Sequence, residues 1–322
     1  MSIQDQNPIP SGFGHKTTAS QVLEGISLSG KTFIVTGGYS GIGVETVRAL
    51  AAAGAKVIVP ARSRAKAEAS LATMPGTVEI ADMDLADLAS VRAFSAAFVA
   101  SGSALHGLIN NAGVMANPLT RIGNGWESQF ATCHLGHFEL ARGLEQPLKA
   151  TAGARVVALS SIAHARGGIN WEDPHYQSRA YDKWEAYGQA KTANALFALG
   201  LDRRWKADGV RAFSVHPGGI LTPLQRHLPD EELVALGWKA ADGSIPPMVQ
   251  AMFKSPEGGA ATAVWCATSP SLEGRGGVYC EDCDIAPLAT DKSQRWEHVR
   301  PWACDDEGAD RLWALSEAMI AA

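Results

Sequence analysis

The stretch Thr32-Phe33-Ile34-Val35-Thr36-Gly37-Gly38-Tyr39-Ser40-Gly41-Ile42-Gly43 decides the fold of this chain. Its apolar first part, residues 32–35, predicts a short buried strand, and residues 44–53 carry apolar side chains at helical spacing. A glycine-rich turn between a strand and a helix offers the helix's free N–H groups and its positive dipole end to a phosphate. The stretch therefore predicts a dinucleotide-binding unit.

The glycines of this turn have separate expected tasks. Gly37 permits the tight turn, Gly41 lets the backbone approach a pyrophosphate, and Gly43 allows close helix packing. The spacing is T-G-x-x-x-G-x-G, which departs from the common G-x-G-x-x-G. A glycine turn without a ligand is the alternative interpretation.

Strands and helices alternate along the chain, which predicts a parallel sheet with helices on both faces. The expected fold is a Rossmann-type, doubly wound α/β domain of about seven strands. We expect one domain over residues 29–322 and an N-terminal arm over residues 1–28, with one short helix near Ser20 to Gly25. The expected strands are 32–35, 56–59, 77–80, 107–109, 155–159, 210–215 and 277–279.

Tyr187 and Lys191 form the main catalytic candidate. They are four positions apart, so on a helix they share a face. An ammonium beside a phenol is expected to lower the pKa of the tyrosine toward neutral pH, which suits a general acid/base. The pair by itself is a weak signal, and the nucleotide-binding turn upstream gives it weight.

The end of the second expected strand indicates which dinucleotide binds. NAD sites of this fold place an acidic side chain there, to bind the ribose 2′-hydroxyl. Here Ala61 takes that place and Arg62 follows it, and a guanidinium favours a 2′-phosphate. We therefore expect NADP(H), with NAD(H) as the alternative. The other interpretation of the basic run is a solvated turn.

Composition agrees with a soluble enzyme. The chain has 322 residues and a formal net charge of −5, which argues against a nucleic-acid binder. No apolar run is long enough to span a bilayer, and the N-terminus lacks a signal-peptide pattern, so we expect a cytoplasmic protein. The five cysteines are expected to be reduced thiols. We expect no metal site, because neither Cys280-x-x-Cys283 nor the pair His134 and His137 has further ligands at a matching spacing.

Five motifs, listed at the end of this paragraph in chain order, resemble those of the short-chain dehydrogenase/reductase family and together extend over nearly the whole chain. The Ser-to-Tyr interval and the run 134–138 look like the retinol-dehydrogenase-like branch, which includes WW-domain oxidoreductase and protochlorophyllide-reductase relatives. The motifs are Thr36-Gly37-x-x-x-Gly41-x-Gly43, Asn110-Asn111-Ala112-Gly113, Ser160-Ser161, Tyr187-x-x-x-Lys191 and Pro217-Gly218.

The resemblance implies roles for individual residues. Tyr187 matches the general acid/base, Lys191 the residue that lowers its pKa and holds the nicotinamide ribose, and Ser161 the serine that binds the substrate oxygen. It also implies a homodimer or homotetramer, with the helices containing His137 and Leu196 at the interface. The implied cofactor site consists of Gly37, Ser40, Gly41, Ile42, Gly43, Arg62, Asp84, Leu85, Asn111, Ala112, Gly113, Tyr187, Lys191, Pro217, Gly218, Ile220 and Thr222.

Cys133 is a departure from the family pattern, which usually has an asparagine at this position. A thiol cannot copy the hydrogen bonds of an amide, so a proton relay through this position is expected to be rerouted or weakened. The preferred interpretation of Cys133 is a buried thiol that fills space, and a catalytic thiol is the alternative.

The expected substrate is a bulky lipophilic ketone, aldehyde or alcohol. Two expected insertions, near residues 162–186 and 222–256, carry apolar and aromatic side chains suited to such a ligand, including Trp171 and Trp184 in the first. The preferred function is an NADP(H)-dependent carbonyl/alcohol oxidoreductase. The alternatives are a nucleotide-sugar epimerase or dehydratase, for which the chain beyond Thr222 looks too short, and a non-catalytic dinucleotide-binding redox sensor.

Overall fold

The computed structural model describes residues 6–294 and 297–321, so residues 1–5 of the expected arm and residue 322 lie outside it. Within this part of the chain, eight strands form one sheet in the order β10-β9-β8-β7-β4-β1-β2-β3. The strands are β1 Thr32–Val35, β2 Lys56–Ala61, β3 Thr77–Asp82, β4 Gly107–Asn110, β7 Arg155–Leu159, β8 Arg211–His216, β9 Val278–Glu281 and β10 Asp284–Ile285.

The seven strands of this sheet that come first along the chain are parallel, as expected, and the last one, β10, is antiparallel. β10 pairs antiparallel with β9, with Asp284 opposite Glu281. The turn between them is tight because Asp282 and Cys283 both have positive φ, 50° and 59°. β10 and the small hairpin of β5 (Arg121–Ile122) and β6 (Trp126–Glu127) were not predicted. Strands of two residues are too short to show the period of two that reveals a strand.

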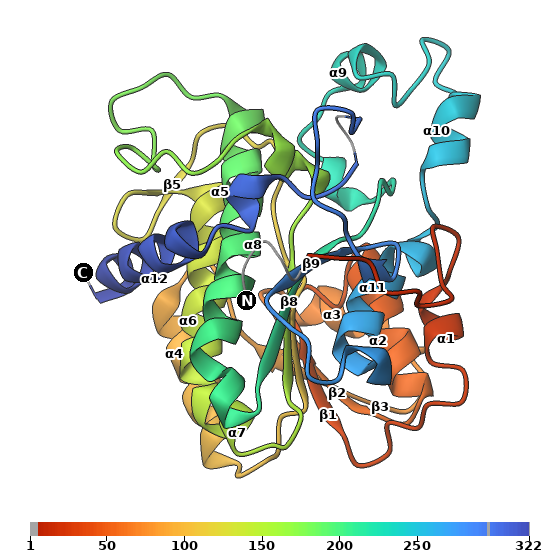
Figure 1. Ribbon diagram of the computed structural model, residues 1–322, viewed down its shortest axis with the longest axis vertical. Helices are drawn as coiled ribbons and strands as arrows, with labels where there is room; N and C mark the ends of the chain where they lie inside the picture. The colour runs from red at the N-terminus through yellow and green to blue at the C-terminus, as the bar shows by residue number, and fades with distance from the viewer. Residues whose placement is uncertain (1–5, 295–296, 322) are drawn as a thin grey trace.

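Helices cover both faces of the sheet (Figure 1). The β8 and β7 strands contact the long α8 on one face, where α4, α6 and α12 also pack, while α2, α11 and α1 pack together on the other. The longer helices are α2 Ile42–Ala52, α3 Arg64–Leu71, α4 Leu88–Ala100, α6 Gly136–Gly143, α8 Lys183–Trp205, α11 Pro256–Thr268 and α12 Asp306–Ala321. The shorter ones are α1 Ala19–Val22, α5 Ser128–Phe130, α7 Glu145–Lys149, α9 Asp230–Ala235 and α10 Pro247–Met252.

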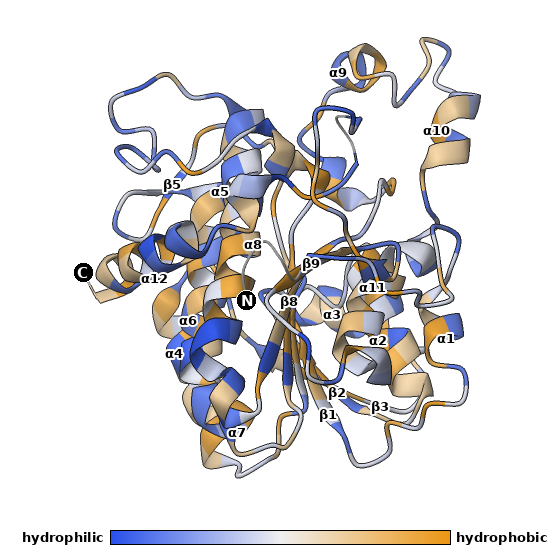
Figure 2. Ribbon diagram, in the orientation of Figure 1, coloured by the Kyte–Doolittle hydropathy of each residue, from blue (hydrophilic) through white to orange (hydrophobic). Residues whose placement is uncertain are grey.

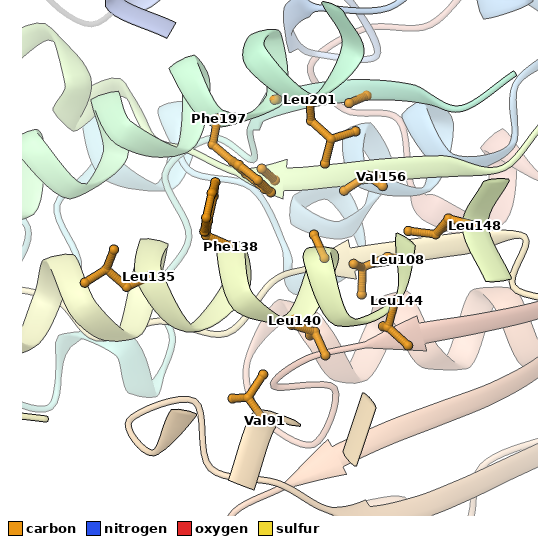
Figure 3. Packing of buried hydrophobic residues seen from close by; sticks show 14 of the residues in the cluster. Val91, Leu108, Leu135, Phe138, Leu140, Leu144, Leu148, Val156, Phe197 and Leu201 are labelled. Atoms are coloured by element: carbon orange, nitrogen blue, oxygen red, sulfur yellow. The ribbon is translucent and has the colours of Figure 1, made fainter. Parts of the chain in front are cut away.

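Alternate residues of each central strand point into two separate hydrophobic cores. In β1, Phe33 and Val35 face the α2–α11 side, whereas Ile34 faces the α6–α8 side. Figure 2 shows hydrophobic residues concentrated along these central strands. Figure 3 shows part of the core on the α6–α8 side, in which Phe138 of α6 and Phe197 of α8 lie next to each other and Leu108 and Val156 come from the sheet. Burial on both faces explains why the strands read as apolar runs.

The helical segment after Glu127 is interrupted. Glu127 accepts hydrogen bonds from the backbone N–H groups of Gln129 and Phe130, which starts α5. A π-helical turn, Ala131–Leu135, then separates α5 from α6, with Cys133 at its centre. Such turns are frequent at functional sites.

The C-terminal helix α12 packs on its own domain. Trp313 lies edge-on to Phe138 and stacks parallel to Phe197, and Arg203 pairs with Asp306 and Asp310. His137 and Leu196 are each 1% exposed within the single chain. These two side chains are therefore covered within the single chain, and the expectation that their helices form a subunit interface stays a prediction.

The N-terminal arm and the expected insertions lie at the edges of the domain. Gln6 forms three hydrogen bonds with the backbone of Tyr279 and Ala286, and α1 packs against α11. The segment that carries α9 and α10 projects from the body of the molecule (Figure 1). No helix among the described residues has the length and apolar character required to cross a membrane.

Candidate active site

A cavity of about 1080 Å³ lies at the carboxyl ends of the strands. This is where parallel α/β sheets bind ligands. Every residue of the expected site lines it except Gly43 and Cys133. The expected residues in its wall are Gly37, Ser40, Gly41, Ile42, Arg62, Asp84, Leu85, Asn111, Ala112, Gly113, Ser161, Tyr187, Lys191, Pro217, Gly218, Ile220 and Thr222.

Helix α8 brings Tyr187 and Lys191 into this wall. Asp182 begins the helix by accepting hydrogen bonds from the backbone N–H groups of Trp184 and Glu185. One turn separates the two side chains, and the Lys191 Nζ lies 5.5 Å from the centroid of the Tyr187 ring. Both residues are buried, at 5% and 4% exposure. The expected pairing on one helical face is therefore found.

The loop after β7 supplies the two serines, which have different partners. The Ser160 hydroxyl donates to the Lys191 carbonyl at 2.7 Å and so ties the loop to α8. Ser161 lies close enough to the Tyr187 side chain to lower its pKa, and its Oγ accepts from the N–H of Ala163. Of the two serines, Ser161 is thus the one whose side chain lies beside Tyr187.

Burial, and not the lysine, sets the protonation of the tyrosine. The pKa of Tyr187 is raised above its ordinary value, first by burial and then by the neighbouring Cys133, and only the hydrogen bond with Ser161 lowers it. The Lys191 Nζ donates to the Leu159 carbonyl at 2.8 Å, and burial lowers the pKa of this lysine. The lowered tyrosine pKa expected from the sequence is therefore wrong for this structure, because desolvation of both groups outweighs their proximity.

The glycine turn forms a cradle that fits a dinucleotide. Gly37 and Gly41 have positive φ, 63° and 56°, and Gly41 is the N-cap of α2. A Cβ on Gly37 would lie 2.9 Å from the Cα of Ala112, so the turn and the segment after β4 meet backbone to backbone. The amide of Asn111 donates to the Thr36 carbonyl, while its Oδ1 is buried without a partner among the described residues. The open helix N-terminus and this free acceptor match a phosphate and a polar ligand.

Gly43 lies behind the cradle instead of in the cavity wall. A Cβ there would lie 2.3 Å from the Gly37 carbonyl oxygen and 2.6 Å from the Asn111 Nδ2. The first turn of α2 can therefore approach the glycine turn only with glycine at this position.

Two arginines follow β2, and they differ in their partners. Arg64 forms a two-point contact with Asp82, at 3.1 and 3.0 Å, and so is neutralised. Arg62 lines the cavity together with Lys66, and it forms no ion pair within the part of the chain that the structure describes. A cation is thus available in the cavity wall just after β2.

Cys133 lies beside the catalytic candidates without reaching the cavity. It is fully buried, and a Cβ on Gly113 would lie 3.3 Å from its Sγ and 3.8 Å from the Lys191 Nζ. Burial raises the pKa of this thiol and outweighs the opposing influence of Lys191. A protonated thiol fits the space-filling interpretation.

An apolar wall closes the cavity above Tyr187. Leu224, Trp238, Met252 and Phe253 line it from the segment after β8. Trp184 meets Trp238 edge-on, and its indole N–H donates to Glu232 of α9 at 2.8 Å. The two tryptophans of the first insertion therefore lie in different places, and only Trp184 packs against the apolar wall. Trp171 lies away from the cavity, because it packs on the α6–α8 core and under Arg311 of α12.

Another part of the cavity wall is polar and was not predicted. It is lined by His15 of the arm, His216 at the end of β8, and Glu281 and Asp282 at the end of β9. Asp282 pairs with the buried Lys254 at 2.6 Å, and burial followed by Asp282 raises the pKa of Glu281 to about 7. The carboxyl-end rule could have found Glu281 and Asp282, since both follow an expected strand. Nothing in the sequence places His15 there.

Sequence comparison with known proteins gives one family. The family model for short chain dehydrogenases matches residues 31–233. The chain is 44% identical to a probable oxidoreductase of Streptomyces lividans, with 92% of this chain and all of that protein covered. It is 38% identical to retinol dehydrogenase 12 of Mus musculus, over 90% of this chain and 86% of the relative.

Solved structures agree in fold. An uncharacterised protein from Mycobacterium paratuberculosis is 34% identical and superposes with a TM-score of 0.70, over 92% of this chain and 95% of that one. An NADP complex of Pseudomonas aeruginosa RhlG, 23% identical, superposes with a TM-score of 0.62 over 79% of this chain and 95% of that one, which shows likeness of fold alone. With the matched glycine turn and the Tyr187–Lys191 helix in place, the chain belongs to the short-chain dehydrogenase family and has retinol-dehydrogenase-like relatives.

Proposed function

We propose that this protein is an NADP(H)-dependent oxidoreductase that interconverts a carbonyl and an alcohol on a bulky lipophilic substrate. One observation carries the proposal. Tyr187 and Ser161 line the cavity that also contains the glycine turn, and Ser161 lies close enough to Tyr187 to lower its pKa. A proton donor and a hydrogen-bond donor thus converge on one point beside a dinucleotide cradle.

A bound nicotinamide dinucleotide supplies hydride exchange with the substrate carbon. Tyr187 holds its proton at neutral pH because its pKa is raised, so it acts as the acid toward a carbonyl oxygen. The Ser161 Oγ already accepts the N–H of Ala163, which leaves its hydroxyl hydrogen for the substrate oxygen. In the direction of oxidation, Tyr187 must first lose its proton and then acts as the base.

The apolar wall supports a lipophilic substrate. Met115, Leu228 and Tyr187 form a buried cluster, against which Leu224, Trp184 and Trp238 pack. Ligand sites of this character bury most of an apolar ligand and orient it with a few polar groups. Relatives named retinol dehydrogenase agree with such a ligand in kind.

Arg62 supports NADP(H) over NAD(H). It is exposed to the cavity and unpaired among the described residues, whereas Ala61 offers no carboxylate for a ribose 2′-hydroxyl. A guanidinium binds a phosphate with two parallel, charge-assisted hydrogen bonds.

The test follows nicotinamide absorbance with a panel of lipophilic ketones, aldehydes and alcohols. Tyr187→Phe should abolish turnover and leave the NADP dissociation constant within about twofold, because the change removes only the phenolic oxygen. Arg62→Glu should weaken NADP binding by about tenfold or more while sparing NAD. Cofactor binding without turnover on any substrate would favour the dinucleotide-binding sensor. Turnover that survives Tyr187→Phe would refute the acid/base role.

The epimerase or dehydratase alternative loses support from the path of the chain beyond Thr222. Among the described residues, the chain beyond Thr222 adds α11 and the strand β9 to the main domain and then forms α12. Within that part of the structure it does not build a second substrate domain. A homodimer or homotetramer and a cytoplasmic location remain our proposals. Sedimentation would test the former, and fractionation of cells the latter.

A further inference from the structure

His137 is a buried imidazole that the proposed chemistry does not use. It lies on α6, 1% exposed, and both ring nitrogens have partners. Its Nδ1 lies 3.0 Å from the carbonyl oxygen of Cys133, and its Nε2 lies 2.8 Å from the Oγ1 of Thr36. The ring therefore spans the gap between the π-helical turn and the start of the glycine turn.

The protons in this link can be placed by counting donors and acceptors. A carbonyl only accepts, so the Nδ1 of His137 carries hydrogen and donates to Cys133. A neutral imidazole has one N–H, so its Nε2 accepts and the Thr36 hydroxyl donates to it. A doubly protonated ring would direct a second N–H at Thr36, where no lone pair is free to receive it.

Both lone pairs of the Thr36 hydroxyl are already in use. The backbone N–H groups of Asn111 and Ala112 donate to its Oγ1, at 2.9 and 3.0 Å. The only other acceptor for the hydroxyl hydrogen is the carbonyl of Ile109, at 3.4 Å, which is beyond the usual range of an O–H···O bond. Without His137 the Thr36 hydroxyl loses its short acceptor. The hydroxyl can then rotate, so its lone pairs are no longer fixed toward the N–H groups of Asn111 and Ala112.

The hydrogen bonds between Thr36 and its two partners connect the two segments that form the dinucleotide cradle. Gly37 follows Thr36 directly, and Asn111 and Ala112 lie in the cavity wall. A Cβ on Gly37 would lie 2.9 Å from the Cα of Ala112, so the distance between these segments has little slack. At its other end the link reaches Cys133, whose Sγ lies near the Cα of Gly113.

We propose that His137 is a positioning residue for dinucleotide binding. By orienting the Thr36 hydroxyl it fixes the spacing between the glycine turn and residues 111–113, and it ties both to the turn that carries Cys133. The inference rests on the proposed function for the identity of the ligand. The effect on residues 111 and 112 does not need that ligand.

His134 provides a matched control. It lies in the π-helical turn directly before α6, is fully buried, and also makes a short hydrogen bond through its Nε2, at 2.7 Å to Ser316 of α12. Its partner lies away from the cradle. Removing either imidazole should cost stability, but only His137 should affect dinucleotide binding.

The experiment measures NADP binding by calorimetry and amide hydrogen exchange by mass spectrometry. His137→Asn keeps a donor near Cys133 but does not reach Thr36, whereas His137→Gln can present an acceptor to Thr36. We expect His137→Asn to raise the NADP dissociation constant by about tenfold and to speed exchange of the Asn111 and Ala112 amides. His137→Gln should restore most of the affinity, and His134→Asn should lower the melting temperature while leaving both readouts within about twofold.

Two results would overturn the inference. One is wild-type affinity and exchange in His137→Asn, and the other is an equal loss of affinity in His134→Asn. If His137→Asn does not fold, Thr36→Val and Thr36→Ser make the same comparison, since only serine keeps the hydroxyl, and equal affinity in both would also refute it. A wild-type protein that binds neither NADP nor NAD would refute the proposed function instead. The exchange of the two amides would still decide the role of His137.

Discussion

Gly43→Ala tests whether the close packing of the glycine turn against α2 is needed for dinucleotide binding. The added Cβ would lie 2.3 Å from the Gly37 carbonyl oxygen and 2.6 Å from the Asn111 Nδ2. Non-bonded carbon contacts are comfortable at about 3.5 Å, so the turn or the helix must move by about 1 Å. Both neighbours are held in place, since Asn111 donates to the Thr36 carbonyl at 2.8 Å. The clash therefore cannot be relieved by a side-chain rotation.

Overpacking of this kind costs about 1–3 kcal/mol. If the turn opens to relieve it, the cost appears as lost affinity, and 1.4 kcal/mol corresponds to a factor of ten. We therefore expect the NADP dissociation constant to rise by about 5- to 150-fold. Titration calorimetry measures this, and a thermal melt on the same sample measures the accompanying loss of stability.

Gly168→Ala is the matched control. Its added Cβ would meet nothing closer than Trp302, at 3.9 Å, and its φ is not positive. This variant should bind and melt like the wild type. Unchanged affinity and melting temperature in Gly43→Ala would refute the reasoning. A loss of stability with unchanged affinity would show that Gly43 packs the helix without shaping the site.

Further predictions concern protons, charge and the thiol. Because burial raises the pKa of Tyr187, alcohol oxidation should rise about tenfold per pH unit between pH 6 and 9, and a flat pH profile of kcat/KM would contradict this. Five of the described histidines have folded pKa values that desolvation lowers to about 4 or less, below the unfolded value of about 6.5. Each should therefore remove about 1.4 kcal/mol of stability per pH unit as pH falls from 6.5 toward 4. Urea unfolding at pH 7 and pH 5 measures this loss, and equal free energies would exclude it. The five are His134 and His216, with pKa about 3, and His137, His164 and His175, with pKa about 4. Asp202→Ala should destabilise the fold by about 3–5 kcal/mol, because it leaves the guanidinium of Arg211 without the carboxylate 2.8 Å away, and an unchanged urea midpoint would refute this. Cys133→Asn should keep or raise turnover despite some loss of stability, and a large fall in kcat would show that the thiol has its own task.

Local patterns accounted for most of the fold and for much of the site. The glycine turn, the strands and the Tyr187–Lys191 spacing each depend on residues a few positions apart, and such residues obey the periods of helices and strands. All seven expected strands occur in the sheet, and the expected cofactor residues other than Gly43 share one cavity. The two-residue strand β10 escaped notice because it has no period to detect.

By itself, the sequence determined the family, the positions of the main strands along the chain, and which side chains follow their carboxyl ends. Only the tertiary structure decided how those side chains are solvated and what lies beside them. Desolvation raises the pKa of Tyr187 where proximity to Lys191 suggested the opposite, and Trp171 packs under α12 while Trp184 joins the cavity's cover. His15 reaches the cavity beside Asp282, and His137 meets Thr36 from 101 residues away. Such contacts depend on the packing of elements distant in the chain, which no short-range period in the sequence encodes.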